Sequence, residues 1–407
     1  MLVAPSGPLD EVRMNLALDR LEAEGVADDT IVIYYSDHGG ILTRSKRFLY
    51  DTGVHIPMIV RFGKNFAHLA PEKAGVKLDR LVSQVDLAPT VLSLAGIAAP
   101  EQMQGIAFLG EHAGEPRDYV YCFRGRMDER YDFCRAVSDG QFKYIRNYHP
   151  HRIYGQHLNY LWKMPATNSW QAEFLAGRCN AEQSAFWQTK PVEELYDTQA
   201  DPWEVKNLAA DPAYGEVLER LRAANRAHLL KTRDSGFLPE AEMVAQAGNG
   251  TIYDLVRDNS RYPLEQIMAA AEAATDGSAG VDRLIEMLGA EHSAIRYWGA
   301  TGCLILGEKA APAKKALTTA LEDSSADVRI TAAEALIKLG ETVRPLAVLT
   351  EELGSKQEYA ALHAANSLEE IGEAARPALP ALEAAATKGS EYVKRASEYT
   401  VEKLGKK

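Results

Sequence analysis

An acid and an imidazole stand side by side directly after an apolar run, and a lysine follows a short distance along the chain. The pair is Asp37-His38, and the lysine is Lys46. A carboxylate suits a hard divalent cation, and a neutral imidazole can join it as a ligand. An ammonium group beside such a cation can hold a tetrahedral anion such as sulfate or phosphate. These residue types indicate half of a metal-assisted ester-cleaving site.

The element that must position the pair is the apolar run before it. Residues 31–35 read Ile-Val-Ile-Tyr-Tyr, β-branched and aromatic without alternation, which is typical of a strand buried on both faces of a parallel sheet. In open α/β sheets, ligands collect beyond the carboxyl ends of strands, which is where Asp37 and His38 come. Gly39-Gly40 lets the chain turn sharply there. Two adjacent residues cannot fill a coordination sphere, so a metal site needs further ligands from elsewhere.

A simpler interpretation of the same residues is also open. Asp-His-Gly after a strand commonly forms only a turn, in which the aspartate caps the loop. Lys46 is then one more solvated charge. The spacing alone does not separate the two interpretations.

Four stretches of the chain, in order, resemble the sulfatase family of the alkaline phosphatase superfamily. They are the helix and strand of residues 9–39 that end in Ser36-Asp37-His38-Gly39, the lysine loop of residues 46–57, the helix of residues 83–92, and the closing signature of residues 194–209. The resemblance implies an α/β fold: part of an alkaline-phosphatase-like sandwich with a mainly parallel sheet, plus a subdomain with a small antiparallel sheet. It implies metal-dependent hydrolysis of sulfate esters or N-sulfates, with a sulfated carbohydrate or an aryl sulfate as substrate.

The resemblance also implies roles for individual residues. Asp37 and His38 would be ligands of a divalent metal, with Ca²⁺ as the cation, and Lys46 would contact the sulfate as a catalytic residue. Further candidates for substrate contact are Arg44, His55 (where relatives often carry arginine) and Arg130.

The nucleophile of this family has no counterpart in the sequence. Family members use a cysteine in a Cys-x-Pro-Ser-Arg or similar context, oxidised to formylglycine. None of the four cysteines has such a context, and they are Cys122, Cys134, Cys179 and Cys303. Ala4-Pro5-Ser6-Gly7 lacks both the nucleophile and the arginine, and the early pair of metal-binding acids is absent as well. We therefore expect a truncated form or a fragment that is inactive alone.

Length and charge set broader limits. A chain of 407 residues with 46% hydrophobic content allows two or three domains. No apolar run reaches the ~18 residues of a membrane span. The net charge of −12 argues against nucleic acid as a partner. Residues 1–8 have neither basic residues nor a long apolar core, so we expect no signal peptide there. Family members are often periplasmic or secreted, but the residues predict no location.

The middle of the chain predicts a hairpin. Residues 133–137 and 142–145 are strand-like, and Asp139-Gly140 lies between them. Basic residues outnumber acidic ones between residues 121 and 155, where Arg130 lies. That excess indicates either a polar sheet face or the rim of an anion cleft.

A repeat occupies the C-terminal part. Leu-Gly or Ile-Gly pairs end four similar alanine-rich helices, and a proline lies five residues after each of the first three glycines. The glycines are Gly307, Gly340, Gly372 and Gly405, and the prolines are Pro312, Pro345 and Pro377. The glycine stops one helix in a left-handed turn and the proline starts the next, which predicts a HEAT-like α-solenoid.

These observations predict four segments: 1–118, part of the α/β core; 119–232, the subdomain with the antiparallel sheet; 233–262, a linker; and 263–407, the HEAT-like repeats. Two other functions stay open. One is a phosphodiesterase or phosphonate hydrolase of the same superfamily. The other is a non-catalytic module that binds a protein partner through the solenoid, against which stands a purely structural role of the repeats in covering the enzyme domain.

Overall fold

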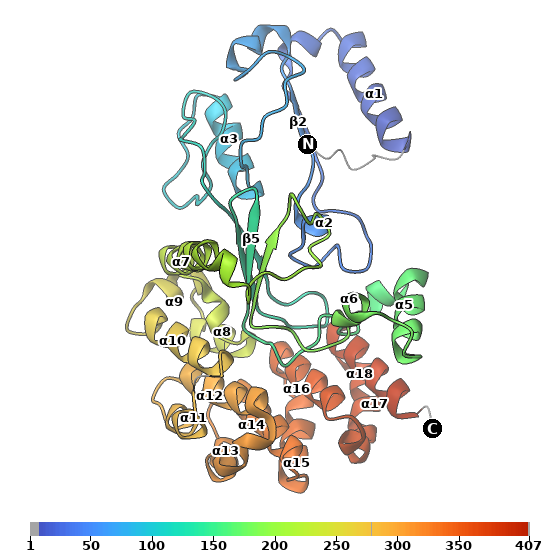
Figure 1. Cartoon of the computed structure of the whole chain (residues 1–407), viewed down its shortest axis with the longest axis vertical. Coiled ribbons are helices and arrows are strands. Elements are labelled where there is room, and N and C mark those ends of the chain that lie inside the picture. Colours follow the sequence, from blue (N-terminus) through green and yellow to red (C-terminus); the bar gives the residue numbers. More distant parts are fainter. Residues whose placement is uncertain (1–7, 278, 406–407) are drawn as a thin grey trace. The chain divides into compact units, whose positions relative to one another are not determined.

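The computed structural model describes residues 8–277 and 279–405 (Figure 1), so Ala4–Gly7 and part of the first predicted segment lie outside them. The chain divides into two compact units that do not follow the predicted segments. The first unit comprises the chain up to Cys122, Arg135–Ile145 and Glu194–Asn225, and the second comprises the remainder. The units do not coincide with the segments predicted at 118, 232 and 262, because the chain passes between the units several times within its middle third.

The N-terminal part of the first unit holds the segment of the Asp-His pair. Its elements are α1 (Pro8–Ala23), η1 (Ala27–Asp29), β1 (Val32–Tyr35), α2 (Asp51–Val54), β2 (Met58–Arg61), η2 (Lys64–Leu69), η3 (Gln84–Asp86) and α3 (Leu87–Leu94). β1 pairs with β2 in antiparallel register, with Val32 opposite Arg61. The mainly parallel sheet that we expected is not formed by the described residues. There, β1 has β2 as its one neighbour, and Tyr35 is exposed instead of buried.

A four-stranded sheet follows, in the order β3 (Val120–Arg124), β4 (Cys134–Ser138), β5 (Phe142–Asn147) and β6 (Glu193–Asp197). The predicted hairpin is confirmed: β4 and β5 are joined by a tight turn in which Gly140 has a φ of 93°. The sheet supplies Val137, Tyr144 and Leu195 to the core of the first unit, and α7 (Gly215–Thr232) supplies Leu221.

The second unit is mostly helical. Its shorter elements are α4 (Asn159–Trp162), α5 (Pro165–Leu175), α6 (Ala181–Ala185), η5 (Ser235–Phe237), α8 (Glu240–Ala247) and α9 (Ile252–Arg257). Its repeat array consists of α10 (Leu264–Thr275), α11 (Val281–Leu288), α12 (Ser293–Leu306), η6 (Gly307–Ala313), α13 (Lys314–Ala320), α14 (Ala326–Lys338), α15 (Val343–Leu353), α16 (Glu358–Glu370), η7 (Gly372–Ala378), α17 (Leu379–Lys388) and α18 (Glu391–Gly405).

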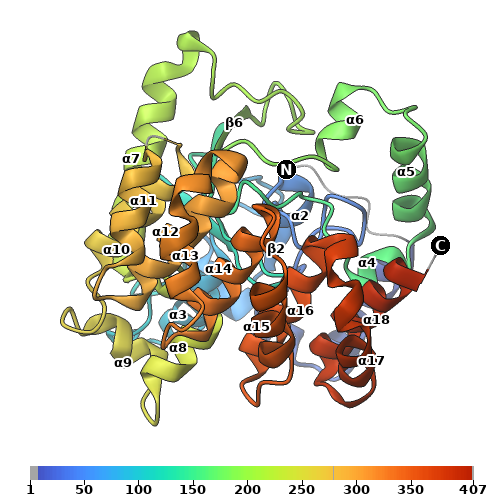
Figure 2. The same cartoon turned by 90° about the horizontal axis from the view of Figure 1, so that it is seen from below.

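The predicted solenoid is confirmed. Gly307, Gly340 and Gly372 all have positive φ values, as a left-handed helix stop requires. Two of the prolines, Pro312 and Pro377, lie within the short helices η6 and η7 and not at the first turn of the next α-helix. Helices α12, α14, α16 and α18 contact one another in series, while α11, α13, α15 and α17 pack outside them. Figure 2 shows this array from below, from gold to red.

The inner row of helices is covered by the chain itself. Each inner helix contacts two stretches of the second unit, residues 129–134 and 146–157, which together we call the bridging segment. The contacts are His149 with Tyr297 of α12, Arg152 with Glu334 of α14, Arg130 with Glu369 of α16, and His157 with Tyr399 of α18, whose rings stack at 3.6 Å. The bridging segment therefore fills the inner face of the solenoid, as a structural role of the repeats requires.

The predicted linker is wrong. Residues 233–262 form η5, α8 and α9, and Phe237, Leu238 and Tyr262 have no exposed surface. The indole Nε1 of Trp298 donates to the carbonyl of Phe237 at 3.0 Å. The glycines and scattered charges of this segment suggested a linker, but five of its large apolar residues are buried in the core of the second unit: Phe237, Leu238, Leu255, Val256 and Tyr262. Within the described residues, no helix has both the length and the apolar character to cross a membrane.

Candidate functional site

The Asp-His pair lies immediately after β1, as the sequence predicts. The carboxylate of Asp37 is exposed, and its Oδ2 lies 3.3 Å from Nε2 of His38. Nδ1 of His38 lies 2.6 Å from the carbonyl oxygen of Gly39, to which it donates. That bond leaves Nε2 as the nitrogen with a free lone pair, on the side of Asp37. A backbone carbonyl that fixes the tautomer in this way is the usual support of a metal-binding histidine.

The loop that follows is fastened to this corner. The amide of Gly39 donates to the carbonyl of Gly53 at 2.9 Å, and the amide of Lys46 lies 3.3 Å from the carbonyl of Gly40. The buried hydroxyl of Ser45 donates to the carbonyl of Thr52 at 2.6 Å. A Cβ on Gly39 would lie 1.8 Å from the oxygen of Thr52, so only glycine fits there. The structure therefore brings the backbones of the Asp-His pair and of Lys46 together in one braced turn.

A buried ion cluster supports the loop from β5 and from the closing signature. Nζ of Lys143 bonds Oδ1 of Asp51 and lies 2.9 Å from Oε1 of Glu204. The other oxygen of Glu204 accepts from the amide of Asp51 at 2.5 Å. Lys143 and Glu204 are both buried. This cluster, which we call the Lys143 cluster, joins three distant parts of the chain beneath the lysine loop.

The charged groups of the cluster shift one another's pKa values. Burial alone would raise the pKa of Asp51, but the hydrogen bond with His55 and the charge of Lys143 lower it to about 2. Burial opposes the charge on Lys143, yet Glu204 and Asp51 outweigh it and hold the pKa of Lys143 above its usual range. Burial raises the pKa of Glu204 despite the nearby ammonium group. The cluster is a structural support, because its groups are paired and buried.

Two of the candidates for substrate contact are engaged by the protein. Arg44 donates to the carbonyls of Trp203 at 2.7 Å and Glu204 at 2.5 Å, and its guanidinium carbon lies 3.5 Å from the ring centre of Tyr50. Its φ of 64° belongs to a tight turn. Arg44 therefore fastens the lysine loop to the closing signature. His55 is largely exposed, with Nδ1 at 3.4 Å from Oδ2 of Asp51.

Arg130 is not placed for substrate contact. It is 1% exposed, lies in the second unit, and bonds Glu369 at 2.5 Å, Asn366 at 2.6 Å and the carbonyl of His157 at 2.6 Å. Two other bases of residues 121–155 are also paired with acids that lie far along the chain, Arg126 with Glu240 of α8 and Arg152 with Glu334 of α14.

Asp86 lies next to this site and joins two loops. Its carboxylate accepts from the amides of Ser83 at 2.9 Å and Ile106 at 2.7 Å and pairs with Arg117.

The described residues do not complete a metal site. They contain no group of three or more His, Cys, Asp or Glu side chains placed to hold an ion. Asp37 and His38 are two donors of suitable type, and a hard divalent cation takes six or more.

Sequence reasoning missed the Lys143 cluster. A signal was present: Lys143 lies between aromatic residues in the strand-like run of β5, in which every residue from Lys143 onward is buried. A lysine at such a position needs a buried acid, but the sequence does not say which acid.

Two family models match the chain. The sulfatase model matches residues 14–97, and the HEAT-repeat model matches residues 314–402. The first match contains Asp37, His38 and Lys46.

Curated relatives are similar over a larger part. An ulvan-active sulfatase of Formosa agariphila is 35% identical over 274 residues, which are 67% of this chain and 45% of the relative. The N-sulphoglucosamine sulphohydrolase of Homo sapiens is 26% identical, over 51% of this chain and 43% of the relative. The chain thus spans less than half the length of the curated relatives it matches.

Among solved structures, a complex with the substrate D-glucosamine-2-N,6-O-disulfate is 21% identical with a TM-score of 0.36. The match covers 54% of this chain and 38% of the chain in that structure.

Proposed function

Because this chain belongs to the sulfatase family, we propose that it carries the metal-binding and sulfate-binding half of a site for hydrolysing sulfate esters or N-sulfates of a glycan. Asp37 and His38 are the metal ligands in this proposal, and Lys46 contacts the sulfate. The names of the relatives, an ulvan-active sulfatase and an N-sulphoglucosamine sulphohydrolase, support a sulfated carbohydrate over a simple aryl sulfate.

The braced turn is the observation that carries the proposal. A solvated loop would not need the bond from Gly39 to Gly53, a glycine that no other residue can replace, or a buried ion cluster beneath it. These features hold the backbone of the Asp-His pair and of Lys46 in one arrangement. Positioning of this kind is what electrostatic stabilisation of a transferring sulfate requires.

The metal is a divalent cation in this proposal, with Ca²⁺ as the candidate. A bound cation of this kind would withdraw charge from the sulfate oxygens. Nε2 of His38 and Oδ2 of Asp37 fit it in type, but two donors do not fit it in number. The described residues supply neither further ligands beside the pair nor a nucleophile of the family type, and we propose that the chain alone does not turn over sulfate esters.

The repeats have a structural role in this proposal. The bridging segment occupies the inner row of helices through contacts with α12, α14, α16 and α18. A protein partner would therefore have to use the outer row. The packing of the repeats against the bridging segment explains the presence of the solenoid without a protein partner, and it is the simpler of the two explanations.

The test uses Tb³⁺, a luminescent substitute for Ca²⁺, on the whole chain. Tyr35 lies two residues before Asp37 and is exposed, so it can sensitise an ion bound at the pair. We expect weak binding, with a Kd on the order of 1 mM or above, as an incomplete oxygen site implies. Asp37→Asn should remove the signal. Asp28→Asn, which changes an exposed acid of η1, is the matched control and should leave it unchanged.

A second measurement concerns sulfate. Inorganic sulfate should bind more weakly to Lys46→Ala than to the unchanged chain, while Lys64→Ala, an exposed lysine of η2, should have no effect. With 4-nitrophenyl sulfate and Ca²⁺ present, the purified chain should show no hydrolysis. Turnover that co-purifies with the chain, or equal Tb³⁺ luminescence with and without the Asp37 carboxylate, would overturn the proposal.

A further inference from the structure

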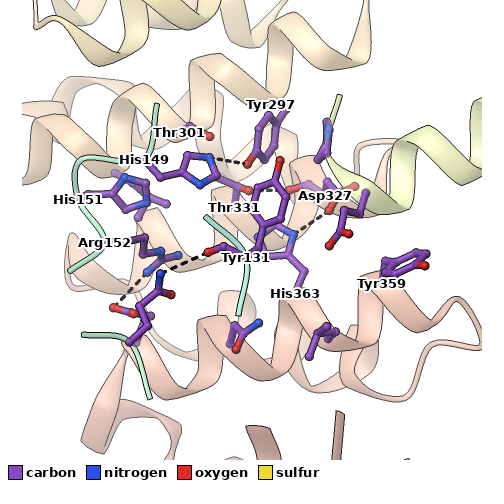
Figure 3. Close-up of a pocket in the computed structure, with 17 residues that line it drawn as sticks. Tyr131, His149, His151, Arg152, Tyr297, Thr301, Asp327, Thr331, Tyr359 and His363 are labelled. Carbon is purple, nitrogen blue, oxygen red and sulfur yellow. Dashed lines mark hydrogen bonds and ion pairs between the residues drawn. The ribbon is translucent and has the colours of Figure 1, made fainter. Parts of the chain in front are cut away.

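The second unit contains a cavity of about 60 Å³ that the sulfatase site does not use. Figure 3 shows its walls: the bridging segment supplies His149, His151 and Arg152, and the inner helices supply Tyr297, Asp327 and His363. A single water molecule needs ~10–15 Å³ of such space, so the cavity has room for several waters or one small molecule. Tyr359 and His363 are half-buried, so the rim of the cavity reaches solvent.

The acids of the wall already have partners. Asp327 accepts from Nδ1 of His363 at 2.7 Å through one oxygen and from the amide of Glu242 at 3.0 Å through the other. Glu370 lies 3.1 Å from Arg152. These acids carry no unpaired negative charge that would attract a cation.

The cation of the wall is paired as well. Arg152 makes two parallel hydrogen bonds of 2.7 Å to the buried carboxylate of Glu334. Because this bidentate pairing is strong, the guanidinium of Arg152 has little hydrogen-bonding capacity left for an added anion. A sulfate or phosphate entering the cavity would have to displace Glu334 or Glu370, so the cavity does not select for anions.

Two histidines of the wall, His149 and His151, are uncharged at neutral pH. Burial lowers the pKa of His149 to about 3, and burial lowers the pKa of His151 well below its usual range. Burial raises the pKa of Tyr297. The phenol of Tyr297 therefore keeps its proton, and its oxygen lies within hydrogen-bond distance of Nε2 of His149, at 3.1 Å.

Two buried polar atoms of the wall have no hydrogen-bond partner within the described part of the chain. They are Nδ1 of His151 and the hydroxyl oxygen of Thr301, which is 1% exposed. Buried polar groups are rarely left without a partner, because each such group costs about 1–3 kcal/mol. Both atoms are neutral, and both belong to residues that line the cavity.

We propose that this cavity binds one small uncharged polyhydroxylated molecule, of the class of a neutral monosaccharide and no larger than one sugar ring. Its hydroxyl groups bond Nδ1 of His151 and the hydroxyl of Thr301, which lack partners inside the protein. The phenol ring of Tyr131, also in the wall, offers the apolar face against which the C–H face of a sugar packs. The site is separate from the Asp37 corner and does not depend on sulfatase activity.

The test titrates the whole chain with D-glucose, D-xylose, L-rhamnose and glycerol, with saturation-transfer NMR and calorimetry as readouts. We expect one-to-one binding of at least one of them, with a Kd of roughly 1–10 mM, as few hydrogen bonds and a small ligand imply. D-glucose 6-sulfate should not compete with the neutral sugars for the cavity. Displacement of a bound neutral sugar by the sulfated one at comparable concentration would overturn the choice of ligand class.

Two variants and one control locate the binding. Thr301→Val keeps the shape and removes the hydroxyl, so affinity should fall about 5- to 10-fold, the value of one hydrogen bond. His151→Phe should abolish binding. Thr400→Val makes the same change at a buried threonine of α18 that does not line the cavity, and it should bind normally.

Circular dichroism melts establish that each variant is folded. Failure of all four probes to bind, with ordered water alone in the cavity of a crystal structure, would overturn the proposal. Unchanged affinity in both Thr301→Val and His151→Phe would do so as well.

Discussion

The buried imidazole of His149 predicts that the second unit loses stability in mild acid. The ring is 5% exposed, and burial lowers its pKa to about 3 from an ordinary 6.5. Between these two values the unfolded chain binds a proton that the folded chain does not. Stability therefore falls as the pH falls below 6.5, and the loss is complete only near pH 3.

The size of the effect follows from the shift. One pH unit is worth about 1.4 kcal/mol for one such group, so lowering the pH from neutral to 5 should remove about 2 kcal/mol through His149. His151 is shifted in the same direction and should add to the loss. The loss through His149 alone is a sizeable part of the 5–15 kcal/mol that is typical of a folded domain.

Urea unfolding at a series of pH values between about 7.5 and 5 measures this loss as a fall in the unfolding free energy. Tryptophan fluorescence is a suitable readout, because the buried ring of Trp298 lies 5.8 Å from that of His149. In His149→Gln the amide oxygen can still accept from Tyr297, but the titration is gone. This variant should lose about 2 kcal/mol less than the unchanged chain on going to pH 5.

His68→Gln is the control, since His68 is exposed, and it should keep the full pH dependence. A stability that is flat between neutral pH and 5, or a pH dependence as large in His149→Gln as in the unchanged chain, would refute the argument that His149 is held neutral by burial.

Three further predictions concern the first unit. Gly39→Ala should destabilise the loop by about 1–3 kcal/mol, because its Cβ meets the Thr52 oxygen, whereas Gly40→Ala, whose Cβ would make ordinary contacts, should cost little in thermal melts. Lys143→Met should cost roughly 3–5 kcal/mol in urea unfolding, because it leaves two buried acids without their cation, and a cost under 1 kcal/mol would contradict the cluster. In a catalytically complete form that includes the missing nucleophile, Lys46→Ala should lower turnover by roughly 10²-fold or more, and unchanged turnover would remove Lys46 from the site.

The sequence predicted those features that depend on local pattern. The Asp-His pair after a strand, the hairpin around Asp139-Gly140 and the glycine stops at Gly307, Gly340 and Gly372 all rest on residues that decide their own conformation. A turn needs its glycine wherever the rest of the chain lies.

The predictions that failed depend on distant partners. Arg130 was assigned to the substrate from its charge, but Glu369 neutralises it from far along the chain. The polar stretch 233–262 was assigned as a linker, although a few apolar side chains such as Phe237 decide its burial. The position of Lys143 in a buried strand indicated that it needs a buried acid, but the sequence did not identify that acid. In each case the residue type indicates that a partner is needed, and only the fold identifies it.

The bridging segment has a consequence for how the protein is made. A solenoid ordinarily adds one repeat at a time, and each repeat is stabilised by its neighbour alone. Here Arg130 is synthesised 236 residues before its partner Asn366, and His157 must wait for Tyr399 of α18. Contacts so distant in sequence form slowly, and the bridging segment stays without its partners while the ribosome completes the array. The second unit can therefore complete its packing only after α18 is synthesised. A ribosome that stalls before α18 would leave the inner face of the helical array partly uncovered.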